Sequence, residues 1–252
     1  MKPIEAETCV DAWLQGCDYL LEQAAWRGYS LVLEITNPIA LPAGDRASYE
    51  LVDAFLTEKG GLPVNTVVNT IFPARHYFRH GANGLYDSYI NKIYPGISQH
   101  PDFDWGTYFF RLIQREDRNG KTISPLNDLV EKLKSQLATT APNRAVYELS
   151  SFDLFLDIPI YDPGSDRKRP LGGPCLTHLS FSIGYDKNLL LTAFYRSHYY
   201  VQRALGNLLG LAHLQNFVAE QTGLAVGPLV CISSMAQLDI SSKKRGKNDV
   251  KK

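Results

Sequence analysis

The stretch GGPCLTHLSFSIGYDKNLLLTAFYRSHYYVQRALGNLLGLAHLQNFVAEQTGL (residues 172–224) carries most of the information about the fold. Apolar residues crowd into Leu176–Ile183 and again into Asn188–Phe194, and the Gly-Tyr-Asp-Lys between them is typical of a hairpin turn. Val201–Thr222 repeats apolar residues at helical spacing, and Gly223 follows where a C′ glycine ends a helix. A strand pair leading into a long helix predicts an α+β domain.

The segments on either side predict further elements of the same domain. The chain opens with an amphipathic helix over Cys9–Ala25 and a strand over Tyr29–Ile35. His80–Asp104 is rich in Gly, Asn, Tyr and Pro and is predicted to be irregular, with short helical turns, while Asp157–Gly173 is predicted to be a mobile loop. The other predicted elements are helices at Arg46–Lys59, Asn65–Tyr77 (broken near Pro73) and Ser124–Leu137, and strands at Ala145–Ser150 and Leu229–Ile232.

Composition and charge exclude several classes of protein. Lys plus Arg and Asp plus Glu both number 26, so no net field attracts nucleic acid or anionic lipid. No apolar run is long enough to cross a bilayer. Together with the balanced charge, this leads us to expect neither a membrane nor a nucleic acid as a partner. We find no linker that separates two cores. Residues 1–240 are therefore predicted to form one domain, and residues 241–252 a basic, disordered tail.

The four cysteines indicate free thiols. Cys9, Cys17, Cys175 and Cys231 form no CxxC pair and have no metal-ligand spacing, and they are too sparse for a disulfide scaffold. The first residues also lack the apolar core of a signal peptide. These features predict a cytoplasmic protein without a metal site.

Two short motifs have residues suited to chemistry. Pro174-Cys175 stands at the mouth of the first hairpin strand, where a rigid backbone can present a thiol nucleophile; the same cysteine also suits a small apolar core position. Tyr195-Arg196-Ser197 ends the second strand just before the long helix. A guanidinium, a hydroxyl and a helix dipole are placed there to bind a phosphate, although a solvated strand end has the same composition.

The order of these motifs resembles the thymidylate synthase family. That family shows a proline-cysteine nucleophile, a short strand pair, a Gln-Arg-Ser and an asparagine on the following helix, and Cys175, Arg196-Ser197 and Asn207 stand in this order here. WRGYSLVLEITNPIAL (residues 26–41) is similar to the family's opening. PNRAVYELSSFD (residues 142–153) is similar to the segment whose arginines reach across the dimer interface.

The resemblance implies a fold, a reaction and partners. The fold is a three-layer α/β sandwich whose mixed sheet packs against its dimer mate, with active sites shared in the homodimer. A cysteine thiolate adds to C6 of a pyrimidine nucleoside 5′-monophosphate, and C5 then takes a methyl or hydroxymethyl unit from 5,10-methylenetetrahydrofolate. The implied roles are nucleophile for Cys175, phosphate clamp for Arg27, Arg196, Ser197 and Arg144 of the partner subunit, and base reader for Asn207.

Several positions depart from the family pattern. Leu176 stands where a histidine follows the cysteine, and His178 lies two residues further on. Tyr199 replaces an acidic residue that contacts the base. Gln237 and Asp239 stand in place of the His-x-Tyr pair that binds the ribose hydroxyl; both can still bond a hydroxyl, with altered geometry and charge.

Proton transfer and folate binding are affected most. Asn69 stands where the family's glutamate works through water on the pyrimidine, and an amide cannot shuttle a proton as a carboxylate does. Tyr108, His178 or His198 would have to relay the proton instead. The segment that closes over the folate is replaced by thirteen residues of basic tail beyond Asp239.

Three interpretations therefore stay open. The chain is an enzyme of altered specificity, a nucleotide-binding or regulatory protein that kept the phosphate pocket and lost turnover, or an α+β domain with a coincidental likeness. The persistence of the Pro-Cys pair favours the enzyme, because a protein that only binds phosphate has no use for a thiol at the base.

Overall fold

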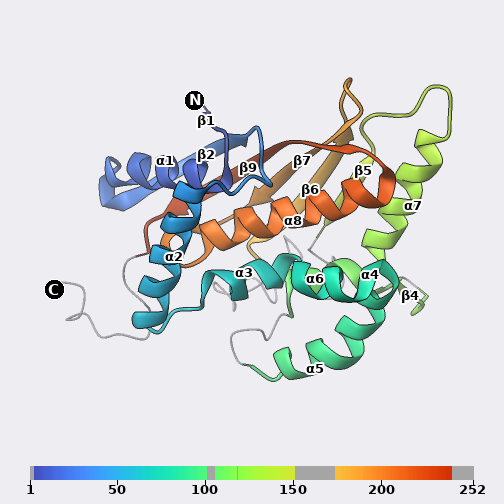
Figure 1. Ribbon diagram of the computed structural model, residues 1–252, viewed down its shortest axis with the longest axis horizontal. Helices are drawn as coiled ribbons and strands as arrows, with labels where there is room; N and C mark the ends of the chain where they lie inside the picture. The colour runs from blue at the N-terminus through green and yellow to red at the C-terminus, as the bar shows by residue number, and fades with distance from the viewer. Residues whose placement is uncertain (1–2, 101–105, 118, 151–173, 240–252) are drawn as a thin grey trace, which may run out of the picture.

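The computed structural model describes residues 3–100, 106–117, 119–150 and 174–239. Its main element is a mixed sheet of seven strands (Figure 1). The strand order is β1-β2-β9-β7-β6-β5, and the short β8 pairs with β9. β9 runs parallel to β7 and antiparallel to β2. The strands are β1 (Ile4–Ala6), β2 (Arg27–Ile35), β5 (Tyr147–Ser150), β6 (Leu176–Ile183), β7 (Asn188–Tyr195), β8 (His198–Tyr199) and β9 (Ala225–Gln237); β3 (Arg115–Glu116) and β4 (Thr122–Ile123) form a separate hairpin.

The described helices cover one face of this sheet in two further layers. α8 contacts β7 and β9 on one side and α1, α3 and α7 on the others, so it lies between the sheet and the outer helices (Figure 1). This arrangement confirms the predicted three-layer α/β architecture. The helices are α1 (Cys9–Leu21), α2 (Ala43–Glu58), α3 (Val64–Ile71), α4 (Ala74–Ser88), α5 (Tyr94–Ile97), α6 (Tyr108–Ile113), α7 (Pro125–Leu137) and α8 (Leu205–Thr222), with the one-turn helix η1 (Ala24–Trp26) and the π-helical turns η2 (Tyr89–Ile93) and η4 (Tyr200–Ala204).

Two glycines allow α3 to approach α8 closely. A Cβ at Gly206 would lie 2.6 Å from Val67 Cβ, and one at Gly210 would lie 2.9 Å from Ile71 Cβ. Both distances are shorter than side chains tolerate, so only glycine permits this packing. α8 is consequently buried on nearly all sides, which corrects the expectation of a single apolar face.

Several boundaries differ from the sequence predictions. His80–Asp104 was expected to be irregular, yet α4, η2 and α5 continue as helix as far as Ile97, with a kink at Gly81 (φ 67°). Leu85 and Tyr89 are buried there, and this tertiary packing outweighs the composition of the segment. The last strand spans Ala225–Gln237 rather than Leu229–Ile232, because β9 is paired on both sides. The hairpin strands, the break at Pro73 and the helix end at Gly223 (φ 73°) are confirmed.

The described ranges contain neither a membrane-spanning helix nor a metal-binding cluster. Within them, no helix is both long and apolar enough to cross a membrane. Nor do three His, Cys, Asp or Glu side chains gather there as a metal site would require. The predicted loop at Asp157–Gly173 and the tail at 241–252 lie outside the described residues.

Candidate functional site

The strand order brings four of the predicted residues to the same end of the sheet, where their strands begin or end. Cys175 precedes β6, Arg196 follows β7, Gln237 ends β9 and Arg27 begins β2. Because β2 and β6 run antiparallel to the strands between them, all four residues lie at the same end. Arg27 and Cys175 are three strand spacings apart across the sheet, at about 4.8 Å each. Arg27 also lies further along the strands, because it pairs with Gln237 whereas Tyr195 pairs with Ser233. Ser197 follows Arg196 at this edge, in the turn before β8.

Cys175 is half-buried and rigidly held. Its backbone N–H donates to Tyr108 Oη at 3.2 Å, and the N–H of Leu176 donates to the same oxygen at 3.3 Å. Burial raises the pKa of the Cys175 thiol, while the charges of Arg196 and Arg203 oppose that rise. The free protein therefore holds a thiol at neutral pH, and two guanidinium groups are placed to stabilise the thiolate.

Arg196 fixes the strand end that carries the thiol. Its backbone N–H donates to the carbonyl of Cys175 at 2.9 Å, and its Nε donates to the carbonyl of Pro174 at 3.1 Å. The Pro-Cys pair and the arginine, distant in the chain, are thus held together by both backbone and side chain.

Two tyrosines lie beside the thiol. Tyr108, at the start of α6, is half-buried, and burial raises the pKa of its phenol to about 12. Since its oxygen accepts the two backbone N–H groups, its own proton is free to be donated, and at neutral pH it can act as an acid only. Tyr195 is fully buried, its hydroxyl has no partner among the described residues, and burial raises its pKa well above the usual value.

Asn207 belongs to a buried polar network. Its amide donates to Nε2 of His198 at 3.0 Å, and Nδ1 of His198 lies 2.9 Å from Ser233 Oγ. The His198 ring stacks on Tyr195 at 4.0 Å between centroids. Burial lowers the pKa of His198 to about 3, so the ring is neutral and its Nε2 can accept the hydrogen bond from the Asn207 amide. His198 consequently holds Asn207 in one orientation, and its lowered pKa makes it a weak proton acceptor at neutral pH.

Asp239 stabilises the start of the long helix. Its Oδ1 accepts the backbone N–H of Val201 at 2.9 Å, and burial raises the pKa of this carboxyl to about 6. Its Oδ2 is buried without a partner among the described residues. Gln237 is half-buried beside it at the end of β9.

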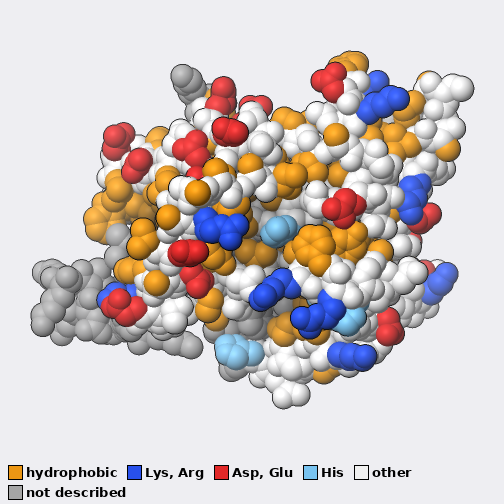
Figure 2. Space-filling view, in the orientation of Figure 1, with side chains coloured by type: hydrophobic (Ala, Val, Ile, Leu, Met, Phe, Trp, Pro, Cys, Tyr) orange, Lys and Arg blue, Asp and Glu red, His pale blue; other side chains and the backbone are white. Residues whose placement is uncertain are grey.

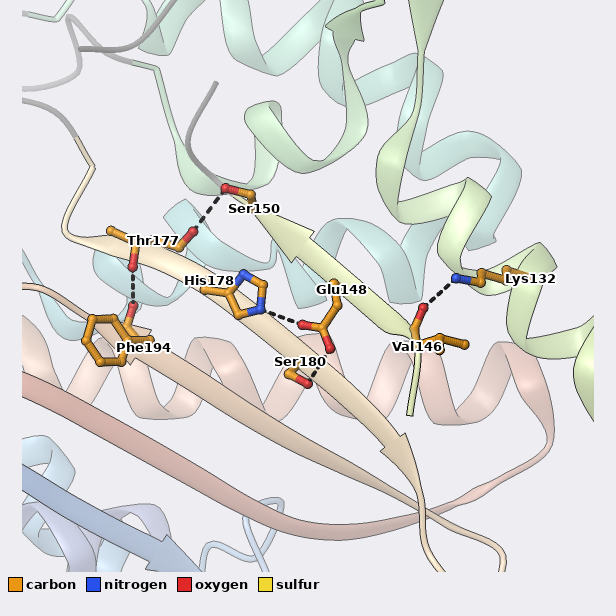
Figure 3. A network of polar contacts seen from close by, with 8 residues as sticks. All are labelled: Lys132, Val146, Glu148, Ser150, Thr177, His178, Ser180 and Phe194. Atoms are coloured by element: carbon orange, nitrogen blue, oxygen red, sulfur yellow. Dashed lines mark hydrogen bonds and ion pairs between the residues drawn. The ribbon is translucent and has the colours of Figure 1, made fainter. Parts of the chain in front are cut away.

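His178 lies on the open face of the sheet, as Figure 3 shows. Its Nε2 is 2.5 Å from Glu148 Oε2, and Ser180 Oγ donates to the other oxygen of that carboxylate at 2.8 Å. The buried residues of β6, Leu179 and Phe181, face the helices instead. The structure therefore places His178 on the opposite face from α8 and its asparagine.

Arg144 lies at the far end of the sheet from Cys175 of its own chain. Its Nη1 donates to the carbonyl of Gly184 at 2.8 Å, and its guanidinium lies 4.6 Å from the Tyr185 ring centre. The eight residues of β6 separate the two ends by about 25 Å. Within one subunit Arg144 cannot reach the thiol.

Asn69 lies on α3 and lines a cavity of about 300 Å³. Thr107, which lines the same cavity, immediately precedes Tyr108, the tyrosine that contacts the backbone of Cys175. The other lining residues are Thr66, Thr70, Pro73, Arg75, His76, Tyr89, Ile93 and Ile97.

Arg203 is a residue that the sequence motifs did not identify. It lies half-buried on η4, and its charge acts on Cys175, Tyr108 and Asp239. Its signal in the sequence was weak, because a lone arginine four residues before Asn207 is indistinguishable from a solvated helix residue. Only the packing of η4 against the sheet edge brings it to the thiol.

Comparison with known proteins identifies the fold. No family model matches the sequence, and no curated protein matches it. Among solved structures, the thermostable thymidylate synthase A from Bacillus subtilis superposes with a TM-score of 0.50 over 92% of this chain and 79% of that enzyme, at 13% identity. The chain has a thymidylate synthase-like fold. The predicted three-layer fold of the single chain is thus confirmed, whereas identity this low carries no residue roles.

The residues at the cavity do not match the folate that the resemblance implies. A tetrahydropterin ring presents several N–H donors, so its site needs strong acceptors. Among the described residues that line the cavity, the polar groups are Asn69, threonine and tyrosine hydroxyls, Arg75 and His76, and there is no carboxylate. These residues therefore do not supply the acceptors that a tetrahydropterin needs.

Proposed function

We propose that this chain is a divergent thymidylate synthase-like protein that acts on a pyrimidine nucleoside 5′-monophosphate. One observation carries the proposal: the half-buried Cys175 lies beside Arg196 and feels the charge of Arg203, at the end of the sheet where Arg27 begins β2. A thiol beside several guanidinium groups suits a ligand with both a phosphate and an electrophilic ring.

The proposed chemistry begins with the thiol. The thiol proton is lost to solvent, and the thiolate of Cys175 adds to C6 of the pyrimidine, so that the C5–C6 electron pair moves toward C4=O and makes C5 a nucleophile. Tyr108, protonated at neutral pH, is placed beside the thiol to donate to the developing oxyanion. For one-carbon transfer, C5 attacks the carbon of a donor at the formaldehyde level, the C5 proton is lost to solvent, and expulsion of the Cys175 thiolate restores the C5–C6 double bond. Water that adds to the transferred carbon gives a hydroxymethyl group, whereas a methyl product also needs a hydride from the donor.

The second subunit completes this proposal. The open face of the sheet carries Phe194 and Ile232, partly exposed, and no described helix covers it. We infer a homodimer through this face, with Arg144 of the partner subunit supplied to the phosphate. We also propose a cytoplasmic location, which the sequence features predict.

A second function is favoured by a specific observation. Burial raises the pKa of Cys175, and Asn69 offers no carboxylate to accept a proton. A missing general base costs about 10²- to 10⁴-fold in rate. The alternative is a nucleotide-binding or regulatory protein that retains the phosphate pocket.

Exchange of the C5 hydrogen separates the two functions without a one-carbon donor. The full chain is incubated with deoxyuridylate, deoxycytidylate, uridylate and cytidylate tritiated at C5, and tritium release is measured alongside nucleotide-induced thermal shifts. Release that Cys175→Ala abolishes and Cys17→Ala preserves supports the enzyme. A thermal shift without release supports the binding protein. Neither signal with any nucleotide overturns both.

A further inference from the structure

The cavity between α3, η2 and α5, here called the α3–α5 cavity, combines an apolar interior with a cationic rim. Pro73, Ile93 and Ile97 supply apolar walls to its volume of about 300 Å³. This volume is at the lower end of small-molecule sites, which suits a ligand with one or two rings. Tyr89 and Thr107 also line it, but their hydroxyls bond each other at 2.8 Å.

A buried nitrogen at the cavity lacks a hydrogen-bond partner. His76 lines the wall, and its Nε2 is buried and unpaired among the described residues. An unpaired buried polar group costs about 1–3 kcal/mol, so a ligand atom that bonds this nitrogen would remove an existing penalty. The orphan atom thus marks where a polar group of the ligand belongs.

Among the described residues that line the cavity, the charged side chain is cationic. Arg75 lines it and is exposed. Burial lowers the pKa of His76, and the charges of His80, Arg79 and Lys92 act in the same direction. Figure 2 shows Lys, Arg and His side chains over the region of α4 and α5, with an Asp or Glu side chain beside them. No carboxylate occurs among the described lining residues. This surrounding favours a ligand whose polar end is an anion.

We propose that the α3–α5 cavity binds a small aryl or heteroaryl carboxylate. The flat ring lies against Ile93, Ile97 and Pro73, and the carboxylate contacts Arg75 and His76 Nε2. The proposal is independent of the nucleotide chemistry at Cys175. Of the residues assigned to that chemistry, only Asn69 lines this cavity.

The test is isothermal titration of the full chain with benzoate and with indole-3-carboxylate. Ligands of this size are expected to bind with Kd of about 0.1–1 mM. Benzamide, which keeps the ring and lacks the charge, should bind about tenfold more weakly. Arg75→Gln should weaken benzoate by a similar factor, and Ile97→Trp, which fills the cavity, should abolish binding. Arg46→Gln, an exposed arginine on α2, is the matched control.

Three results would overturn the proposal. They are equal binding of benzamide and benzoate, complete displacement of benzoate by inorganic phosphate at equal concentration, and unchanged binding in Ile97→Trp. Tetrahydrofolate that displaces benzoate and binds more tightly would assign the cavity to a one-carbon donor instead. Because none of these titrations involves a nucleotide, failure here leaves the exchange test at Cys175 unaffected.

Proton uptake gives a second readout. The carboxylate raises the pKa of His76, which is depressed in the free protein, so affinity should rise as pH falls from 8 to 6. The other charged or titratable groups around the cavity are Arg75, Arg79, His80, Lys92 and Tyr89. His76→Gln should remove the pH dependence while His80→Gln retains it. The reverse pattern would contradict the proposed contact.

Discussion

A single buried imidazole links the candidate site to the stability of the core. His198 stacks on Tyr195 and bonds Asn207 and Ser233, and its burial keeps it neutral. No local pattern marks a histidine two residues after an arginine as a core residue. Its position on the short strand β8, just before the π-helical turn η4, gives it this role.

His198 should make the fold acid-sensitive. Its pKa is about 3 in the folded chain against 6.5 ordinarily, so the unfolded chain binds a proton first and stability falls as pH drops below about 6.5. Between pH 7.5 and 5 this contribution is about 2 kcal/mol. Urea unfolding at the two pH values measures it, and His198→Gln should flatten the difference.

The NMR signal of His198 in the unaltered chain provides a check that needs no variant. A ring that titrates between pH 5 and 8 would contradict the prediction.

Asp239 acts in the opposite direction: its pKa is raised to about 6, so its stabilising effect is complete below pH 3.8 and is lost as pH rises through 6. Asp239→Asn isolates that opposing contribution.

Arg203 should control the reactivity of the thiol. Arg203→Gln removes a positive charge that lowers the pKa of Cys175, so alkylation at pH 8 should slow by about two- to tenfold. Iodoacetamide labelling of the peptide that contains Cys175, read by mass spectrometry over a pH series, measures the shift. Arg46→Gln should leave the profile unchanged, and an unshifted profile in Arg203→Gln would refute the assignment.

At the scale of elements, the contact between α3 and α8 is set by two glycines. Gly206→Ala places a methyl 2.6 Å from Val67 Cβ and 2.9 Å from the carbonyl oxygen of Val64, so one helix has to move. We expect a loss of about 1–3 kcal/mol in unfolding free energy. Gly44→Ala, in the first turn of α2 with no atom within 4 Å, should be neutral or stabilising by up to about 1 kcal/mol.

Chemical unfolding of both variants provides the measurement. If the unfolding free energy changed no more in Gly206→Ala than in Gly44→Ala, the methyl at position 206 would be accommodated without strain. The contrast matters for function, because Asn207 follows Gly206 on the same helix. A shift of α8 would move the asparagine with it.

At the scale of the whole molecule, the open face of the sheet should be a dimer interface, a prediction that rests on the proposed function. A stable interface buries at least about 1,200 Å². Glu148 and His178 on this face already bond each other, so covering them leaves few unpaired groups. Phe194→Asp should convert a dimer into a monomer in sedimentation experiments, while Leu51→Asp, 73% exposed on α2, should not. A monomeric unaltered chain would contradict the interface.

Local sequence patterns were sufficient for several elements of this protein. The β6–β7 hairpin, the helix that ends at Gly223 and the break at Pro73 follow from turn chemistry and apolar spacing over a few neighbouring residues. The placement of Cys175 beside Arg196 also followed from the order of the motifs, because a hairpin brings its two ends together.

Other features depended on contacts between residues distant in the chain. The helical run through α4, η2 and α5 is held by burial of Leu85 and Tyr89, and β9 is long because two strands pair with it. Arg203 reaches the thiol, and His198 the asparagine, only through the packing of η4 and β8. Their energies come from burial and from charges in a low-dielectric core, which spacing along a chain does not encode.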